Sequence, residues 1–193
     1  MKQEPINTEI FIKNMVCPRC IMVVNKCLTK QHLTIISIEL GKAVVKEYLS
    51  NTKKNIIAKE LELLGFELLS NKKTKIIERI KNVVIAFVHY QKNNLHQNLS
   101  DYIAYSLHQE YSYLSKIFSE HENSTIEQYF IAQKIEKVKE LLSYGELTLN
   151  EIAYSLNYSS SAYLSTQFKQ ITGMTPSKYK TMTLKNRKSL DAI

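Results

Sequence analysis

The chain has 193 residues, of which 44% are hydrophobic and 23% charged, enough apolar side chains for one or two small packed domains. Only four glycines and three prolines leave little room for the turns of an all-β fold, so helix should dominate. The net charge is +8, but residues 1–95 hold 16 Lys+Arg against 8 Asp+Glu, while residues 96–193 hold 10 of each. Charge favours nucleic-acid affinity somewhere in the chain without assigning it to the second half.

Membrane insertion and secretion are not indicated. The longest apolar stretch, residues 83–88, is too short to span a bilayer, and residues 1–5 contain no apolar core of a signal peptide. We therefore expect a cytoplasmic protein without a membrane partner, whose three cysteines are reduced rather than paired in a disulfide framework.

Residues 9–70 alternate between strand and helix patterns. The predicted elements are strand 10–13, helix 21–28, strand 33–40, strand 43–48, helix 55–64 and strand 66–69. The third element shows a period of two at Ile36, Ile38 and Leu40, and Gly41-Lys42 predicts the turn that follows. The second helix should bury Ile56, Ile57, Leu61 and Leu64. The order βαββαβ is that of the ferredoxin-like split unit.

A separate helix is predicted over residues 75–90. Its apolar residues step by four and three, as in a heptad seam: Ile76, Ile80, Val83, Phe87 and Tyr90. This helix could form a homodimer through residues 76–90 or pack within the chain. Residues 71–95 carry a net charge of +5, from 6 basic and 1 acidic side chains, which suits either a phosphate contact or a solvated helix face. Residues 91–94 are the expected break before the C-terminal domain.

Residues 96–182 are predicted to be all helical, with an internal repeat. The first predicted helix begins at 99–101, with Ser100 as N-cap, and further helices begin at 111, 126 and 149. The next helix ends at 172, and a last short helix begins at Thr175-Pro176. Residues 103–107 match 152–156 at a shift of 49, and Phe118 matches Phe168 at a shift of 50. Each copy reads as a helix-turn-helix, whose second helix enters a DNA groove. Most tyrosines are interpreted as core residues.

This half resembles the DNA-binding domain of AraC/XylS-type transcription activators. The resemblance covers residues 96–182 and rests on the paired Ile-Ala units and on the closing sequence of residues 168–180. It implies that two recognition helices enter successive major grooves, with RNA polymerase as a further candidate partner. Carried over by position, the residues facing DNA are Ser112, Ser115, Lys116, Ser161, Ser165 and Thr166.

Cys17-Pro18-Arg19-Cys20 follows a predicted strand and opens a helix. Two thiolates at this spacing can bind one soft ion, and a helix N-terminus lowers their pKa. With Met15, they resemble the loop of heavy-metal-associated domains, a resemblance that covers residues 9–70. Cu(I) would suit two sulfurs, whereas Zn(II) would need two more ligands. A structural pair and a thiol redox sensor remain open alternatives. Cys27 is expected in the core and His32 at the surface.

Enzyme motifs are not found, and the histidines of the later helices, His89, His96, His108 and His121, read as surface or helix-end residues. We therefore predict an α+β protein: a ferredoxin-like domain over residues 1–70, a linking helix over 71–95, a tandem helix-turn-helix domain over 96–182 and a tail from 183. The predicted function is a sequence-specific regulator that binds double-stranded DNA and responds to a metal or to thiol state. The alternative is a metal-binding protein whose helical half is a protein-interaction module without a DNA role.

Overall fold

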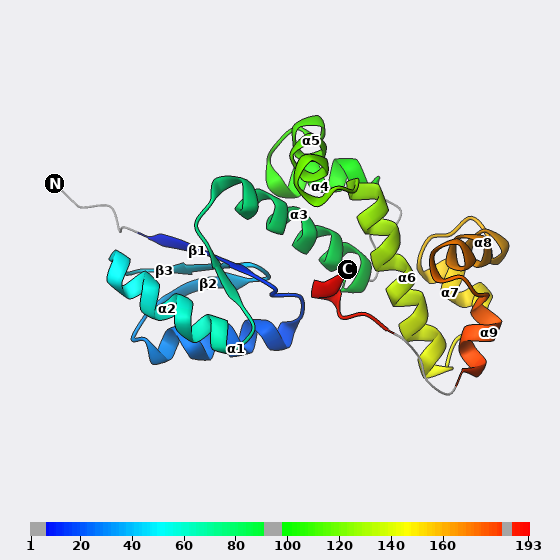
Figure 1. Ribbon diagram of the computed structural model, residues 1–193, viewed down its shortest axis with the longest axis horizontal. Helices are drawn as coiled ribbons and strands as arrows, with labels where there is room; N and C mark the ends of the chain where they lie inside the picture. Colours follow the sequence, from blue (N-terminus) through cyan, green and yellow to red (C-terminus); the bar gives the residue numbers. More distant parts are fainter. Residues whose placement is uncertain (1–6, 91–97, 183–186) are drawn as a thin grey trace. The chain divides into compact units, whose positions relative to one another are not determined.

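The computed structural model describes residues 7–90, 98–182 and 187–193, and its contacts divide the chain into two compact units, Met1–Asn82 and Val83–Ile193 (Figure 1). The expected break at residues 91–94 and His96 lie outside the described residues. Over the described ranges, no helix combines the length and the apolar character that crossing a bilayer requires.

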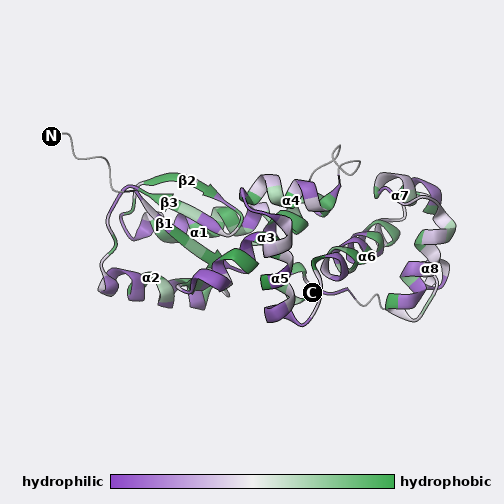
Figure 2. Cartoon of the chain, turned by 90° about the horizontal axis from the view of Figure 1, so that it is seen from above, coloured by the Kyte–Doolittle hydropathy of each residue, from purple (hydrophilic) through white to green (hydrophobic). Residues whose placement is uncertain are grey.

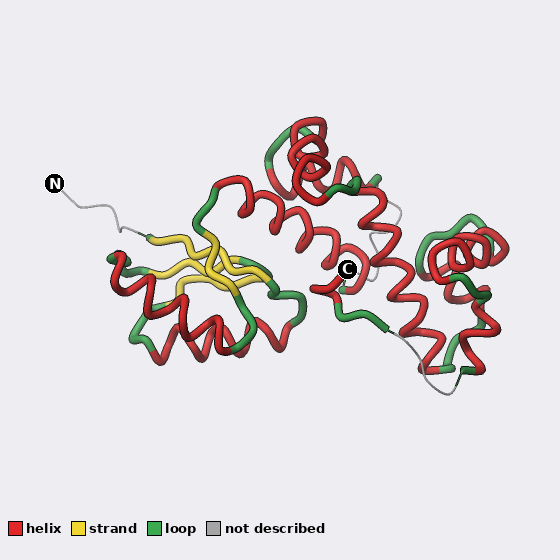
Figure 3. The backbone as a smooth tube through the Cα atoms, viewed as in Figure 1, coloured by secondary structure: helices red, strands yellow, loops and turns green. Residues whose placement is uncertain are grey.

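The first unit begins with strands and helices in the order βαββαβ. They are β1 Thr8–Lys13, α1 Pro18–Lys30, β2 Ile35–Glu39, β3 Lys42–Val45, α2 Asn51–Leu63 and β4 Glu67–Leu69. The strands form one antiparallel sheet in the order β2-β3-β1-β4, and both helices lie against the same face of it (Figures 1 and 3). The chain is therefore a mixed α+β protein with a small antiparallel sheet at its N-terminal end.

The core of this unit lies between the sheet and its two helices. Hydrophobic residues dominate the strands, whereas α2 mixes hydrophobic and hydrophilic positions (Figure 2). Ile12 of β1, Val24 and Leu28 of α1 and Ile57 and Leu61 of α2 are fully buried together. Burying five such side chains at about 1.5–3 kcal/mol each is a large part of what a small domain needs to fold.

Three apolar positions expected inside this core are exposed instead. Ile36 is 51% exposed because the β2–β3 register shifts between Ile35 and Ser37, which breaks the period of two. Ile56 and Leu64 are 44% and 49% exposed, since α2 buries only the narrow row of Ile57 and Leu61 against the sheet. The helical period is confirmed, but the buried stripe of α2 is narrower than the sequence predicts.

Helix α3 spans Lys72–His89, and the division between the two units falls within it. Of the heptad positions, Ile76, Ile80 and Phe87 are buried, and the Phe87 ring lies 4.8 Å from that of Tyr102. Burial also reaches residues beside the seam: Ile77, Val84, Ile85 and Val88. This wide apolar face is used within the chain, which favours the intramolecular reading, while a homodimer stays a prediction.

The second unit is helical in its described residues. Its elements are α4 Leu99–Leu107, α5 Tyr111–Glu122, α6 Ile126–Tyr144, α7 Leu149–Ser155, α8 Ser161–Thr172, α9 Pro176–Thr181 and the short 3-10 helix η1 Leu190–Ala192. Helix α6 contacts α5 at one end and α7, α8 and α9 at the other, so it connects two small helical clusters (Figure 1).

Local signals fix most of the helix ends. Gly145 and Gly173 adopt the left-handed conformation at the C-caps of α6 and α8, as glycine allows without strain. The N-cap of α4 is Asn98 rather than Ser100, because the Asn98 side chain accepts a hydrogen bond from the backbone N–H of Ser100. The helix thus starts at Leu99, one residue after its Asn98 cap and earlier than the sequence predicts.

Candidate nucleic-acid interface

Two helix-turn-helix units with equivalent turns stand on either side of α6. The first is α4, a turn and α5, and the second is α7, a turn and α8. His108 and Asn157, which correspond at the shift of 49, both adopt left-handed backbone angles, with φ of 52° and 51°. A non-glycine residue rarely takes this conformation, so two of them at equivalent positions show that the repeat extends to the backbone of the turn.

Each recognition helix is held by its buried row. Leu114 and Phe118 of α5 and their equivalents Leu164 and Phe168 of α8 have no exposed surface. The side chain of Ser160 caps α8 by accepting a hydrogen bond from the N–H of Tyr163. Because the inward row is fixed, the opposite row of each helix is presented to solvent in a defined direction.

The exposed row differs between the two helices. On α5 it comprises Ser112, Tyr113, Lys116 and Glu120. On α8 it comprises Ala162, Tyr163, Thr166, Lys169 and Gln170. These residues follow the helical period and include hydroxyl, ammonium and amide groups, which can contact bases or phosphates.

Three of the six side chains predicted to face DNA are exposed, namely Ser112, Lys116 and Thr166, and the other three are half-buried, namely Ser115, Ser161 and Ser165. The Ser165 hydroxyl donates to the carbonyl of Ser161 at 2.8 Å, and the Thr166 hydroxyl donates to the carbonyl of Ala162 at 3.1 Å. Their protons are used within α8, so toward a ligand both oxygens are placed to accept a hydrogen bond.

Several tyrosines predicted to be core residues are exposed instead. Tyr113 and Tyr163, equivalent at the shift of 50, are 47% and 53% exposed, and Tyr105 and Tyr154, equivalent at the shift of 49, are 79% and 82% exposed. The sequence predicts core positions for most tyrosines, because helical spacing alone does not tell which aromatic lies beside the buried row. The internal repeat does contain a signal for this exposure, since a tyrosine directly precedes the buried leucine in both copies, at Leu114 and at Leu164.

Helix α6, which joins the two helix-turn-helix copies, carries buried polar groups. Lys134 is 8% exposed, its ammonium lies 3.7 Å from the centre of the Tyr158 ring, and burial lowers its pKa to about 8. Gln133 is fully buried and hydrogen bonds to a ring nitrogen of His89 at 3.0 Å. His89 is the last residue of α3, in line with the expected surface or helix-end position, but its side chain is half-buried, and this burial lowers its pKa to about 4.

The cysteine pair lies at the start of α1 in the first unit. The sulfurs of Cys17 and Cys20 are 3.3 Å apart, and Cys17 is the N-cap residue. Burial alone would raise the pKa of the Cys17 thiol, but hydrogen bonds from the backbone and thiol of Cys20 outweigh it, so this pKa is lowered. Burial raises the pKa of Cys20. The pair therefore offers one thiol that ionises readily and one that resists ionisation.

The donor set around this pair is small. Cys27 is buried, as expected, and its sulfur contacts a carboxylate oxygen of Glu60 at 3.7 Å. Across residues 7–90, 98–182 and 187–193, no group of three or more His, Cys, Asp and Glu side chains could hold a metal ion together. Two sulfurs suit a soft ion such as Cu(I), whereas the tetrahedral set that Zn(II) prefers is not provided by this part of the chain.

Comparisons with known proteins find relatives of the helical half. Residues 103–182 match the family model described as a helix-turn-helix domain. An uncharacterized HTH-type transcriptional regulator of Pseudoalteromonas carrageenovora is 33% identical over 104 residues, covering 53% of this chain and 61% of the relative. The Msm operon regulatory protein of Streptococcus mutans is 35% identical over 78 residues, covering 40% of this chain and 28% of the relative. The chain thus spans less than two thirds of each of these relatives.

Among solved structures, the C-terminal domain of AraT, a response regulator from Geobacillus stearothermophilus, aligns with a TM-score of 0.48 and 24% identity, over 57% of this chain and 87% of that one. The repeated turn, the two recognition helices and the matched family model agree on one domain type. Residues 103–182 therefore form a helix-turn-helix domain, as the resemblance to AraC/XylS-type activators implied.

Proposed function

We propose that this protein is a DNA-binding transcription regulator of AraC/XylS type that reads DNA through α5 and α8. The observation that carries the proposal is the family match over residues 103–182, together with a solvent-facing row on both recognition helices. The two relatives described above are named as regulators, which supports the same function. The six residues predicted from the sequence, with Tyr113, Tyr163, Lys169 and Gln170 added, are the proposed contact set.

Selection of bound sequences from a random DNA pool tests this function. A regulator with two recognition helices should enrich a motif with two elements about one helical turn apart. No enrichment, with the protein folded, would favour the alternative in which the helical half is a protein-interaction module.

Affinity measurements on the enriched site then test the residues. Lys116→Ala should weaken binding about tenfold and lower the salt dependence, because the substitution removes a positive charge from the proposed interface. Ser161→Ala combined with Thr166→Ala should weaken binding without changing the salt dependence. Lys59→Ala is the matched control, since Lys59 is exposed on α2, outside the helix-turn-helix domain. Equal losses for Lys116→Ala and Lys59→Ala would contradict the proposed interface.

We further propose that the first unit is a ferredoxin-like domain of the heavy-metal-associated kind, whose Cys17 and Cys20 bind Cu(I) and alter DNA affinity. The strand order β2-β3-β1-β4 and the two sulfurs 3.3 Å apart support this reading. Within this unit, two polar contacts connect the cysteine pair to α3. The Cys20 thiol contacts the carbonyl of Asn14, whose backbone N–H donates to the buried carboxylate of Glu78 in α3.

Competition for Cu(I) against a calibrated chelator tests the metal site. Cys17→Ser and Cys20→Ser should each abolish tight binding, whereas Cys27→Ser should leave it unchanged because the Cys27 sulfur faces Glu60. The DNA affinity of the reduced protein, measured with and without Cu(I), tests the coupling. An affinity that is the same in both states would refute metal control while leaving DNA binding intact.

A further inference from the structure

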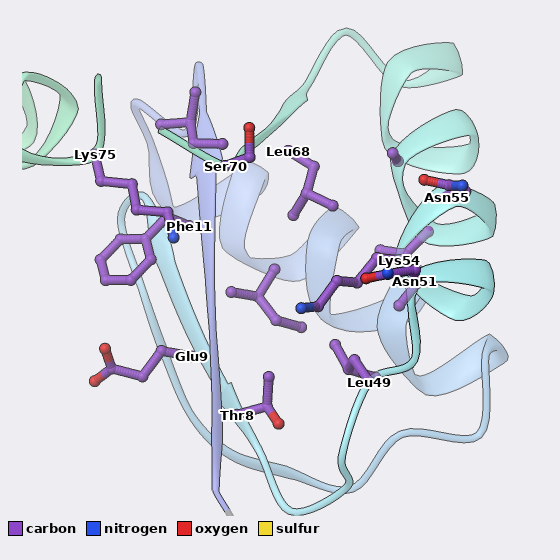
Figure 4. Close-up of a pocket in the computed structure, with 14 residues that line it drawn as sticks. Thr8, Glu9, Phe11, Leu49, Asn51, Lys54, Asn55, Leu68, Ser70 and Lys75 are labelled. Atoms are coloured by element: carbon purple, nitrogen blue, oxygen red, sulfur yellow. The ribbon is translucent and has the colours of Figure 1, made fainter. Parts of the chain in front are cut away.

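A cavity of about 470 Å³ opens beside strand β1 in the first unit, and neither Cys17 nor Cys20 lines it (Figure 4). One wall is apolar and comes from Ile10 of β1, Leu49, Ile57 of α2 and Leu68 of β4. The volume is in the range of small-ligand sites, and such sites typically combine apolar walls with a few polar groups. Neither the proposed DNA interface nor the cysteine pair uses this cavity.

The cavity exists because β4 is shorter than β1. The β1–β4 ladder pairs residues only from Phe11 to Lys13, whereas β1 extends back to Thr8 and pairs there with β3 alone within the described chain. The backbone N–H of Ile12 donates a hydrogen bond to the carbonyl of Gly41, on the side of β1 that faces β3. Since alternate residues of a strand point their backbone groups to opposite sides, the N–H and C=O of Glu9 point toward the side that β4 does not reach.

Two lysines line this space, Lys54 of α2 and Lys75 of α3. Lys54 extends from α2 toward β1 across the apolar wall (Figure 4). In the part of the chain that the structure describes, its ammonium has no carboxylate partner. Asn51, one turn before Lys54 on α2, adds a neutral amide to the same lining.

Glu9 is the acidic residue among those that line the cavity, and its carboxylate is already paired. Glu9 lies on the opposite face of β1, on the side of Phe11 and Lys75 (Figure 4), and its carboxylate forms an ion pair with the ammonium of Lys42 at 2.6 Å. The ammonium of Lys75 lies over the Phe11 ring at 5.0 Å. The charge that remains uncompensated at the cavity is therefore positive.

We propose that this cavity binds a small amphiphilic anion, with one anionic head group facing Lys54 and an apolar body against Ile10, Leu49 and Ile57. The exposed backbone edge at Glu9 supplies a further hydrogen-bond donor for a polar part of the ligand. The binding is a property of the first unit and does not depend on whether the protein binds DNA.

Octanoate is the probe that tests this site, in a titration of the full chain followed by amide chemical shifts. Octanamide keeps the apolar body without the charge, and acetate keeps the charge without the body. We expect octanoate to shift the amides of Glu9, Leu49 and Leu68. Both control probes should bind at least about tenfold more weakly, because octanamide lacks the charge that faces Lys54 and acetate lacks the apolar chain that packs against the wall.

A matched pair of variants separates this site from general attraction to a basic domain. Lys54→Gln should weaken octanoate binding about tenfold. Lys59→Gln removes the same charge from an exposed position of α2 that does not line the cavity, and it should leave the affinity unchanged. Octanoate that shifts no cavity amide, binds no better than octanamide, or responds equally to the two substitutions would overturn the proposal.

Discussion

Lys134 is a buried cation whose surroundings affect the stability of the fold. Its ammonium is buried in α6 over the Tyr158 ring at 3.7 Å and the Phe130 ring at 5.4 Å. The rings attract the cation, while the loss of hydration on burial disfavours its charged form and lowers its pKa. The charged form of Lys134 therefore lowers the free energy of unfolding of the helix-turn-helix domain at neutral pH.

This cost predicts a pH dependence. The pKa is about 8 in the folded protein against an ordinary value of 10.5, so between these values the unfolded chain binds more protons. The contribution of Lys134 to the free energy of unfolding should therefore rise by about 1.4 kcal/mol for each pH unit within that window. Urea unfolding between pH 7 and 9.5 should show this rise in the native chain and not in Lys134→Met. The exposed Lys178→Met should behave like the native chain, and identical pH profiles for Lys134→Met and the native chain would contradict the assignment.

At the scale of elements, the sequence predicted the strands and helices from local patterns, and it missed what depends on tertiary contacts. Gly145 and Gly173 mark the ends of α6 and α8 because glycine adopts the left-handed conformation without strain, so those ends could be predicted. The exposure of Ile56 and Tyr163 depends on how wide a stripe the neighbouring elements cover, which periodicity does not contain. The helical positions of the proposed contacts followed from the repeat, whereas the burial of His89 required the fold.

The capping box of α7 gives an element-scale prediction. Thr148 accepts a hydrogen bond from the N–H of Glu151, and the Glu151 carboxylate accepts one from the N–H of Thr148. Thr148→Ala should lower the free energy of unfolding by about 1 kcal/mol, because it leaves an orphan donor at the helix start. Thr181→Ala, at the exposed end of α9, should cost less than about 0.5 kcal/mol in the same denaturation experiment. A Thr148→Ala protein as stable as the native chain would show that the cap is not formed in solution.

For the whole molecule, charge and the family match lie in different halves. The excess of eight positive charges lies in residues 1–95, whereas the helix-turn-helix domain belongs to the electrically balanced half. Nonspecific attraction to DNA scales with the cations that neutralise phosphates, while sequence preference depends on base contacts. The two properties should therefore be separable by substitutions in different units of the chain.

We predict that Lys72→Gln combined with Lys73→Gln, both exposed at the start of α3, weakens binding to unrelated duplex DNA. The slope of log affinity against log salt should fall by about 1.8 if both lysines contact phosphates. The motif enriched from random DNA should stay the same. The control is Lys26→Gln with Lys59→Gln, which removes the same charge from exposed positions of α1 and α2. Equal slopes for the two double variants would assign Lys72 and Lys73 to a solvated helix face.

The difference between the exposed rows of α5 and α8 has a consequence for the orientation of a DNA site. Lys116 and Glu120 on one helix correspond to Thr166 and Gln170 on the other, so the two copies of the repeat share a backbone but not a chemical surface. A reader with two different ends distinguishes the two directions in which its site can lie along a duplex. If the protein acts as proposed, inverting such a site in front of a promoter would reverse the orientation of the bound protein. The effect on transcription would then depend on the orientation of the site as well as on its sequence.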